Sequence, residues 1–165
     1  FGEGTKASTI VNKIVQTSGI NLNIISYGTD YVFNEGYTVD GSPLDALSDV
    51  ADQSKSALFY RRGQLTLRWM YDGNDTSGMF MLNNSTGLTN SPTMERRDDD
   101  WTEDDDDGGQ GRYQYSAESI LNYRVTTGDQ VKLQSEFIDI VGTVLSGEHS
   151  FDGTNPLTTL ELGVK

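Results

Sequence analysis

Cysteine is absent from the sequence, and histidine occurs once, as His149. Without cysteine the chain cannot build a disulfide scaffold, a thiolate nucleophile, or a cysteine-ligated zinc or iron–sulfur site. A serine–histidine–aspartate triad would depend on His149 alone. We therefore expect a structural role for His149, and the residue inventory predicts no catalytic residue, metal site or cofactor.

Long apolar runs are also missing. No stretch approaches the length of a membrane-spanning helix, and the first residues lack a signal-peptide pattern. The chain begins with Phe1 rather than methionine, so we expect a soluble segment of a longer polypeptide. Its 165 residues suit one domain or two small ones.

Basic residues are scarce, with 12 against 25 acidic residues and a net charge of -13. A tight nucleic-acid binder needs a positive stripe that displaces counterions, and the sequence shows none. Short carboxylates hold water densely, whereas long ammonium side chains expose hydrocarbon, so the composition suits concentrated salt. It indicates a halophilic source, for example a haloarchaeal one, with an ordinary acidic surface as the alternative.

Residues 1–70 have the pattern of a small αβ domain. Apolar residues recur at helical spacing over residues 7–18, with Ser8 and Thr9 as candidate caps. Residues 20–26 alternate between apolar and polar, and residues 31–41 continue in extended, aromatic-rich form. The pattern predicts one helix followed by two strands.

A second helix is predicted where Ser42 can act as a cap and Pro43 takes the first helical position. Its expected buried face consists of Leu44, Leu47, Val50 and Ala51. Two extended runs follow over residues 57–70, around a turn at Arg62 and Gly63. The element order predicts a small sheet with two helices on one side.

The second half changes character. Residues 71–111 are polar and predict a linker or hairpin. Residues 112–165 contain four extended runs with turns at residues 127–129 and 152–153, which indicates an antiparallel β-barrel-like portion. The fold class predicted for the whole chain is α+β.

An acidic insert at residues 98–109 holds seven aspartates and one glutamate. A calcium EF-hand needs glycine at loop position 6 and a bidentate glutamate at position 12. With Gly108 at position 6, Gln114 stands where that glutamate belongs, and no helix is predicted before the loop. We expect no dedicated metal site in the insert, although weak cation binding stays open.

Two enzymatic or sugar-binding interpretations are weaker. A pair of carboxylates acting as acid and base would be drawn from Glu118, Glu136, Asp139 and Glu148. The predicted strands put most of these on a polar face, so solvation explains them better. Trp101 could be an exposed carbohydrate platform, whereas Trp69 lies on the predicted apolar face of a strand.

Two stretches carry a resemblance to a known family: "TGLTNSPTMERRDD" at residues 86–99 and "ILNYRVTTGDQVKLQSEFIDIVGTVLSGEHSFDGTNPLTTLEL" at residues 120–162. They resemble the C-terminal half of the tail hub proteins of tailed viruses, the baseplate hub or late-control D-like group. Residues 8–67 resemble the small αβ domain that precedes it, so the resemblance covers nearly the whole chain. The chain departs from the family where Thr127 replaces a usual proline and where the acidic insert lengthens a hairpin tip.

The resemblance implies a structural, non-enzymatic virion protein of the tail tip or baseplate. Such a hub forms a ring, expected to be a homotrimer, that joins the tail tube to the tip and leaves a channel for DNA. Its implied partners are copies of itself, the tail tube, other tail-tip and baseplate proteins, and the tape measure protein. Repeated acid around a channel would repel phosphate, so DNA is expected to pass without specific binding.

The resemblance also implies an incomplete barrel, because hub barrels use strands that would precede Phe1. Two other functions remain open from the sequence. Residues 8–69 also resemble the N-terminal ring or signalling modules of secretins and outer-membrane receptors. A glycan-binding or hydrolytic tail-tip domain is the third class.

Overall fold

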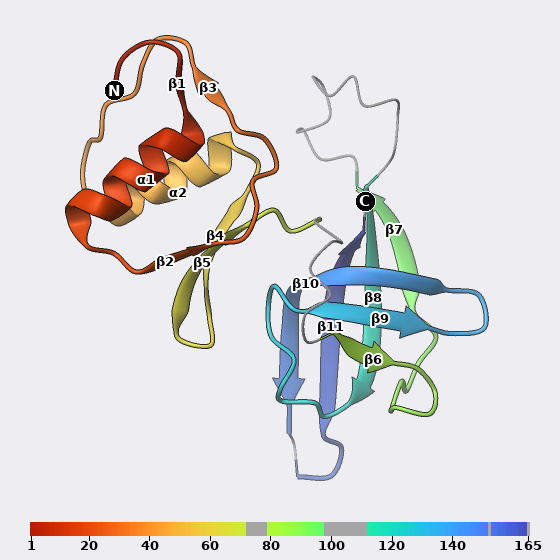
Figure 1. Ribbon diagram of the computed structural model, residues 1–165. Helices are drawn as coiled ribbons and strands as arrows, with labels where there is room; N and C mark the ends of the chain where they lie inside the picture. Colours follow the sequence, from red (N-terminus) through yellow and green to blue (C-terminus); the bar gives the residue numbers. More distant parts are fainter. Residues whose placement is uncertain (72–78, 98–111, 152, 165) are drawn as a thin grey trace. The chain divides into compact units, whose positions relative to one another are not determined.

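The structure, a computed structural model, describes residues 1–71, 79–97, 112–151 and 153–164 (Figure 1). Its elements are helices and mixed or antiparallel sheets, which confirms the predicted α+β class. The chain divides into two compact units, Phe1–Trp69 and Met70–Lys165. Each unit has its own hydrophobic core.

Helix α1 spans Ala7–Ser18, where the sequence predicted it. Its apolar side chains recur every three to four residues, and Ile10, Val11 and Ile14 are buried. The helix ends at Gly19, whose left-handed backbone (φ 70°) lets its N–H donate to the Val15 carbonyl at 3.0 Å.

The expected caps of α1 are wrong. The N-cap residue is Lys6, which makes no side-chain cap hydrogen bond. Asp30 accepts hydrogen bonds from the N–H and the hydroxyl of Ser8, each at 2.9 Å. A carboxylate from a later loop therefore satisfies the first turn, and helical spacing alone cannot reveal such a partner.

Helix α2 spans Pro43–Gln53 and begins with a capping box, as Ser42 and Pro43 predicted. The Ser42 hydroxyl accepts from the Asp45 N–H at 3.1 Å, and Asp45 accepts from the Ser42 N–H at 3.2 Å. These hydrogen bonds from Ser42 hold the pKa of the Asp45 carboxyl below its usual value.

One position on α2 was assigned to the wrong face. Leu44 is 42% exposed, whereas Ala46, Leu47 and Val50 are buried. Leu44 lies in the first turn at the margin of the buried stripe, so its spacing from Leu47 was a poor guide.

The sheet of the first unit has the order β2-β5-β4. Strand β2 is Leu22–Ile24, β4 is Ala57–Arg61 and β5 is Gln64–Arg68. β4 and β5 form the predicted hairpin, in which Arg62 (φ 51°) and Gly63 (φ 78°) make the turn.

Both helices pack against this sheet, and Leu67 is buried in the same core as the helical side chains (Figure 1). The predicted two-helix αβ arrangement is therefore present. Strands β1, Thr5–Lys6, and β3, Val32–Phe33, form a separate two-stranded sheet. Only this short part of the extended run at residues 31–41 is a strand.

The second unit is a six-stranded sheet in the order β6-β9-β10-β11-β8-β7. Its strands are β6 Phe80–Leu82, β7 Thr93–Arg97, β8 Arg112–Ile120, β9 Gln130–Gln134, β10 Asp139–Ser150 and β11 Leu157–Val164. The pairs are antiparallel except β6 with β9, which is parallel. Two of these strands, β6 and β7, lie inside the segment 71–111 that the sequence predicted as a polar linker or hairpin, and β7 pairs antiparallel with β8, the next strand along the chain.

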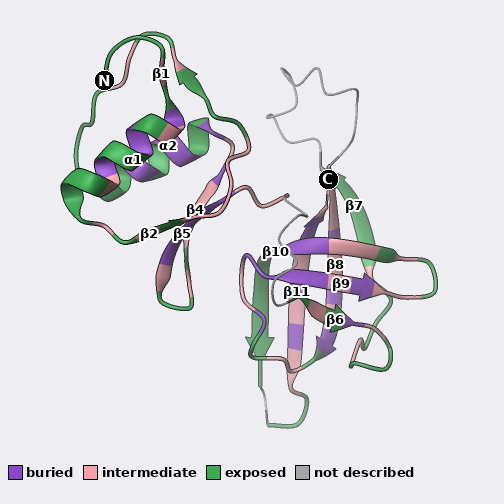
Figure 2. Cartoon of the chain, in the orientation of Figure 1, coloured by how far each residue is buried: buried purple, intermediate pink, exposed green. Residues whose placement is uncertain are grey.

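The core of the second unit consists of buried residues on the strands of this sheet, which Figure 2 shows in purple. Alternate residues point inward along the central strands, among them Tyr115 and Ala117 of β8, Leu160 of β11 and Leu133 of β9. The residues between them face the other side of the sheet and are mostly polar. The central strands therefore bury one apolar face, whereas the opposite face of the sheet is polar and open.

Candidate interaction surface

Four glutamates share the open face of the second sheet. They are Glu95 on β7, Glu118 on β8, Glu161 on β11 and Glu148 on β10. The strand register places them together, because Glu118 and Glu148 lie opposite Thr159 from its two sides. We call these four residues the acidic face.

A shallow depression of about 240 Å³ lies within this surface. It is lined by Thr93, Glu95, Gln114, Ser116 and Glu161. The Gln114 amide donates to the Glu161 carboxylate at 2.7 Å, which holds that carboxylate against the sheet. The depression is polar and anionic, so it repels phosphate and attracts cationic groups.

Glu118 binds the segment between β6 and β7 through its side chain. Its Oε1 atom accepts from the Thr89 hydroxyl and from the Asn90 side-chain amide, each at 2.8 Å. The Thr89 N–H also donates to the Glu118 carbonyl at 2.9 Å. Glu118 therefore fastens the segment between β6 and β7 to β8.

The other carboxylates suggested for acid–base chemistry are also solvated or paired. Asp139 forms a salt bridge with Lys132 and accepts from the Gln134 amide at 3.3 Å. The hydrogen bonds from Lys132 and Gln134 lower the pKa of Asp139. Glu136 is exposed in the turn between β9 and β10.

These four candidates do not assemble as a catalytic pair. Glu118 and Glu148 are separated by strand β11, which puts their backbones roughly 10 Å apart at the usual strand spacing. A carboxyl group becomes a general acid near neutral pH when burial disfavours its charged form. Glu118 is half-buried, and Glu136, Asp139 and Glu148 are exposed.

His149 uses both ring nitrogens in hydrogen bonds. Its Nε2 lies 3.1 Å from the Val125 carbonyl, and its Nδ1 lies 2.9 Å from the Thr158 hydroxyl. The Thr158 hydroxyl in turn accepts from the Asn122 N–H at 2.8 Å. His149 therefore ties residues 122–125 to strands β10 and β11, which is a structural arrangement.

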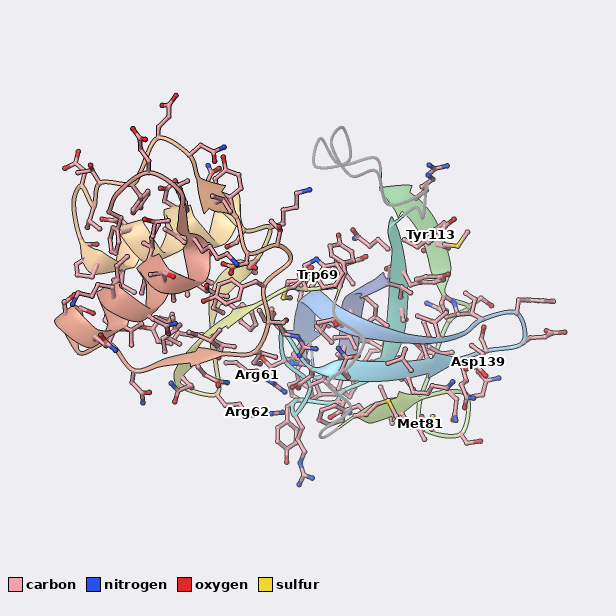
Figure 3. The ribbon with its side chains drawn as sticks, turned by 45° about the horizontal axis from the view of Figure 1, so that its top comes forward. Arg61, Arg62, Trp69, Met81, Tyr113 and Asp139 are labelled. Atoms are coloured by element: carbon pink, nitrogen blue, oxygen red, sulfur yellow. The ribbon has the colours of Figure 1, made fainter. Side chains whose placement is uncertain are left out.

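Two edges of the second sheet carry exposed methionines. Within the described part of the chain, β6 pairs only with β9 and β7 only with β8. Met81 on β6 is 46% exposed and Met94 on β7 is 55% exposed; Figure 3 shows Met81 on its strand. Unpaired edges are templates for strand addition and are usually covered in folded proteins.

Steric crowding explains why a glycine occupies the middle of the Thr86-Gly87-Leu88 stretch. Gly87 has φ +106°, and a Cβ atom there would overlap Cγ1 of Ile120 and lie 2.8 Å from its Cδ1. The Thr86 hydroxyl accepts from the Asn83 N–H at 2.8 Å and donates to the Met81 carbonyl at 2.9 Å. This stretch therefore joins the edge strand β6 to the end of β8.

Of the two tryptophans considered in the sequence, the structure describes Trp69 and leaves Trp101 undescribed. Trp69 is half-buried just after β5, and its backbone N–H donates to the Ser26 carbonyl at 3.2 Å. Trp101 and the acidic insert at residues 98–109 lie outside the described residues.

The described residues contain no group of three or more histidine, aspartate or glutamate side chains that could hold a metal ion. Within the same ranges, no helix is long and apolar enough to cross a membrane.

Both units together have a fold seen in phage tail proteins. One such structure is the 43 kDa tail protein of prophage MuSo2 from Shewanella oneidensis, with a TM-score of 0.53 and 10% identity. The match covers 97% of this chain and 63% of that protein, so the chain spans less than two thirds of its length.

A second similar structure is the tail protein from Neisseria meningitidis MC58, with a TM-score of 0.54 and 10% identity. That match covers 99% of this chain and 67% of the other. No family model matches the chain, and no curated protein sequence does. At this identity the likeness shows a shared fold.

Proposed function

We propose that the chain is a structural protein of a virus tail, located in the virion at the tail tip or baseplate. The observation that carries this proposal is the likeness of fold to two phage tail proteins over nearly the whole chain. The likeness includes both the small αβ unit and the six-stranded sheet, so it does not rest on one common motif.

Within the tail, the chain acts as a hub that forms a ring between tail tube and tip. The two open edges of the second sheet support this, because strands or side chains from neighbouring copies would cover Met81 and Met94. The ring is proposed as a homotrimer. Tail tube, tape measure and other tip or baseplate proteins are the further partners.

The role is non-enzymatic and includes passage of DNA. The candidate carboxylates lie apart from one another on the sheet and its turns, where they are exposed to solvent or bound to neighbouring side chains.

The acidic face would line the channel and keep phosphate from binding to the wall. A ring reconstruction that places these four glutamates on the outer wall would contradict the channel assignment.

The test of the ring is light scattering combined with particle images of the purified chain. We expect a closed ring with a central opening. Met81→Lys and Met94→Lys should reduce ring formation, because a lysine at a strand edge opposes strand addition. Phe151→Lys is the matched control, since Phe151 is 71% exposed in the turn after β10 and lies on neither edge.

A wild-type chain that stays monomeric at every concentration would overturn the ring. So would rings that form equally well with both edge substitutions.

A further inference from the structure

Strand β4 forms an open edge of the sheet in the first unit. The strand order is β2-β5-β4, so β4 pairs with β5 on one side and with no other described strand on the other (Figure 1). The Leu67 carbonyl of β5 accepts from the Ile25 N–H, so the backbone of Leu67 faces β2. Leu58, which lies opposite Leu67 in the hairpin, therefore directs its backbone N–H and carbonyl away from β5.

This edge offers a short ladder of hydrogen-bonding groups. Backbone direction alternates along a strand, so the N–H and carbonyl of Tyr60 face the same way as those of Leu58. Within the described part of the chain, no hydrogen bond uses these outward groups. The Tyr60 side chain is 67% exposed, so this end of the strand is accessible. A partner strand can add here without displacing a strand of the sheet.

The β4–β5 hairpin is the basic region of an acidic chain. From Gln53 to Tyr71 the sequence holds four basic residues and no acidic one, whereas the whole chain has 12 basic and 25 acidic residues. Lys55 precedes β4 by two residues, Arg61 ends the strand and Arg62 begins the turn. The edge of β4 is therefore flanked by positively charged residues at both ends.

The turn of the hairpin supports a role for this charge. Arg62 has φ 51° and Gly63 has φ 78°. A two-residue turn of this kind favours asparagine or aspartate at its first position and glycine at its second. A long side chain rarely adopts the left-handed conformation that Arg62 has. Residues that keep such a backbone against local preference gather at functional sites.

We propose that the outer edge of β4 binds an extended acidic segment of another protein, which adds to the sheet as a further strand. Main-chain hydrogen bonds to Leu58 and Tyr60 supply affinity, and the basic hairpin selects acidic side chains. A second copy that added its own β4 would bring two basic hairpins together, so like charge opposes it. A nucleic acid has no ladder of N–H and carbonyl groups, so charge alone would hold it.

This inference goes beyond the proposed tail function and does not depend on it. The edges proposed for ring contacts are β6 and β7, which belong to the second unit, whereas β4 belongs to the first. A partner strand on β4 and a ring through the second sheet therefore use different residues.

The first test is fluorescence anisotropy of a labelled peptide that alternates glutamate with valine, titrated with the whole chain. We expect saturable binding that is about tenfold or more tighter than binding of the same peptide with lysine in place of glutamate. Arg62→Asn should weaken binding about two- to fivefold, because one exposed charge pair contributes modestly and asparagine suits the turn.

Tyr60→Pro tests the backbone ladder. It removes an N–H that faces outward and leaves the hydrogen bonds between β4 and β5 in place. We expect Tyr60→Pro to weaken binding of the acidic peptide about tenfold or more. Tyr60→Thr is the matched control, because it keeps the N–H while removing the aromatic ring, and should stay within about threefold of wild type. Circular dichroism checks that both variants are folded.

Hydrogen–deuterium exchange of the wild-type chain locates the bound peptide without any substitution. The N–H groups of Leu58 and Tyr60 should exchange more slowly when the acidic peptide is present. The N–H of Phe59, which faces β5, should change little.

The proposal is overturned by a lack of saturable binding up to the millimolar range, by equal binding of the two peptides, or by tighter binding of a single-stranded oligonucleotide of equal charge. Slower exchange confined to β6 or β7 would also overturn it, as would Tyr60→Pro binding as tightly as Tyr60→Thr. Ring formation is scored separately with Met81→Lys and Met94→Lys, so either proposal can fail alone.

Discussion

At the scale of single residues, the Ser42 hydroxyl decides how α2 begins. It accepts from the Asp45 N–H and donates to Asp45 Oδ2 at 2.7 Å. We expect Ser42→Ala to lower the free energy of unfolding by about 1 kcal/mol, measured by urea denaturation with helical circular dichroism. Ser91→Ala, at an exposed position outside any helix, is the control and should change little.

The loss caused by Ser42→Ala should depend on pH. Hydrogen bonds from Ser42 lower the pKa of Asp45 in the folded state. A depressed carboxyl pKa stabilises the fold above the ordinary aspartate pKa of about 4, and that contribution disappears as pH falls through the folded value. The difference between wild type and variant should therefore shrink below about pH 4. A difference that grows there would contradict the capping box.

His149 makes a second residue-scale prediction, on its tautomer. The Val125 carbonyl can only accept, so Nε2 must carry the proton and the neutral ring must accept from Thr158 at Nδ1. Because this is the chain's single histidine, a long-range proton–nitrogen NMR spectrum gives one unambiguous pattern. Thr158→Val should shift the Nδ1 signal, and a spectrum with the proton on Nδ1 in the wild type would contradict the arrangement.

A hydrogen bond between side chains can be predicted from the sequence when its partners lie close together along the chain. Ser42 and Asp45 are three residues apart, so their cap is visible as a pattern. Ser8 and Asp30 are 22 residues apart, and no local sequence pattern predicts the hydrogen bond between them. The same holds for Glu118, which was read as a surface carboxylate and instead anchors Thr89 and Asn90 across 29 and 28 residues.

At the scale of elements, Gly87 is the point where the segment after β6 crosses β8. Gly87→Ala forces a Cβ atom against Ile120 at a positive φ, and we expect a loss of about 2–4 kcal/mol in unfolding free energy. Gly153→Ala is the control that measures the cost of the positive φ alone, because Gly153 has φ +89° and an added Cβ atom there would have no atom within 4 Å. The steric explanation fails if both substitutions cost the same or if Ile120→Ala does not rescue Gly87→Ala.

Long periodic elements were predictable and short ones were not. α1, α2 and the β4–β5 hairpin repeat their pattern over enough residues to be recognised. β6 has three residues, too few for alternation to show, and it pairs with β9, whose partner residues lie 51 positions later, as for Phe80 and Val131. The segment expected to be a linker or hairpin contributes both edge strands of the second sheet.

At the scale of the whole molecule, the α+β class followed from the order of helical and extended segments, because each segment must bury its apolar face against another. The two cores consist of residues from separate halves of the chain, as the change of character after Met70 suggests. The acidic face could not be foreseen as a group. It requires the register of β7, β8, β10 and β11, which alternation within single strands does not give.

Net charge makes the last prediction, which concerns the whole chain. With a net charge of -13 at pH 7, folding brings like charges together, so the free energy of unfolding should rise between 0.05 and 1 M NaCl. Near the isoelectric point of about 4.2 the net repulsion vanishes, and the same salt increase should then have little effect. Thermal unfolding at both pH values measures the difference, with sucrose of equal osmolality as the control for excluded-solute effects. If salt acts equally at both pH values, or lowers stability at pH 7, close ion pairs rather than net repulsion govern the electrostatics of this fold.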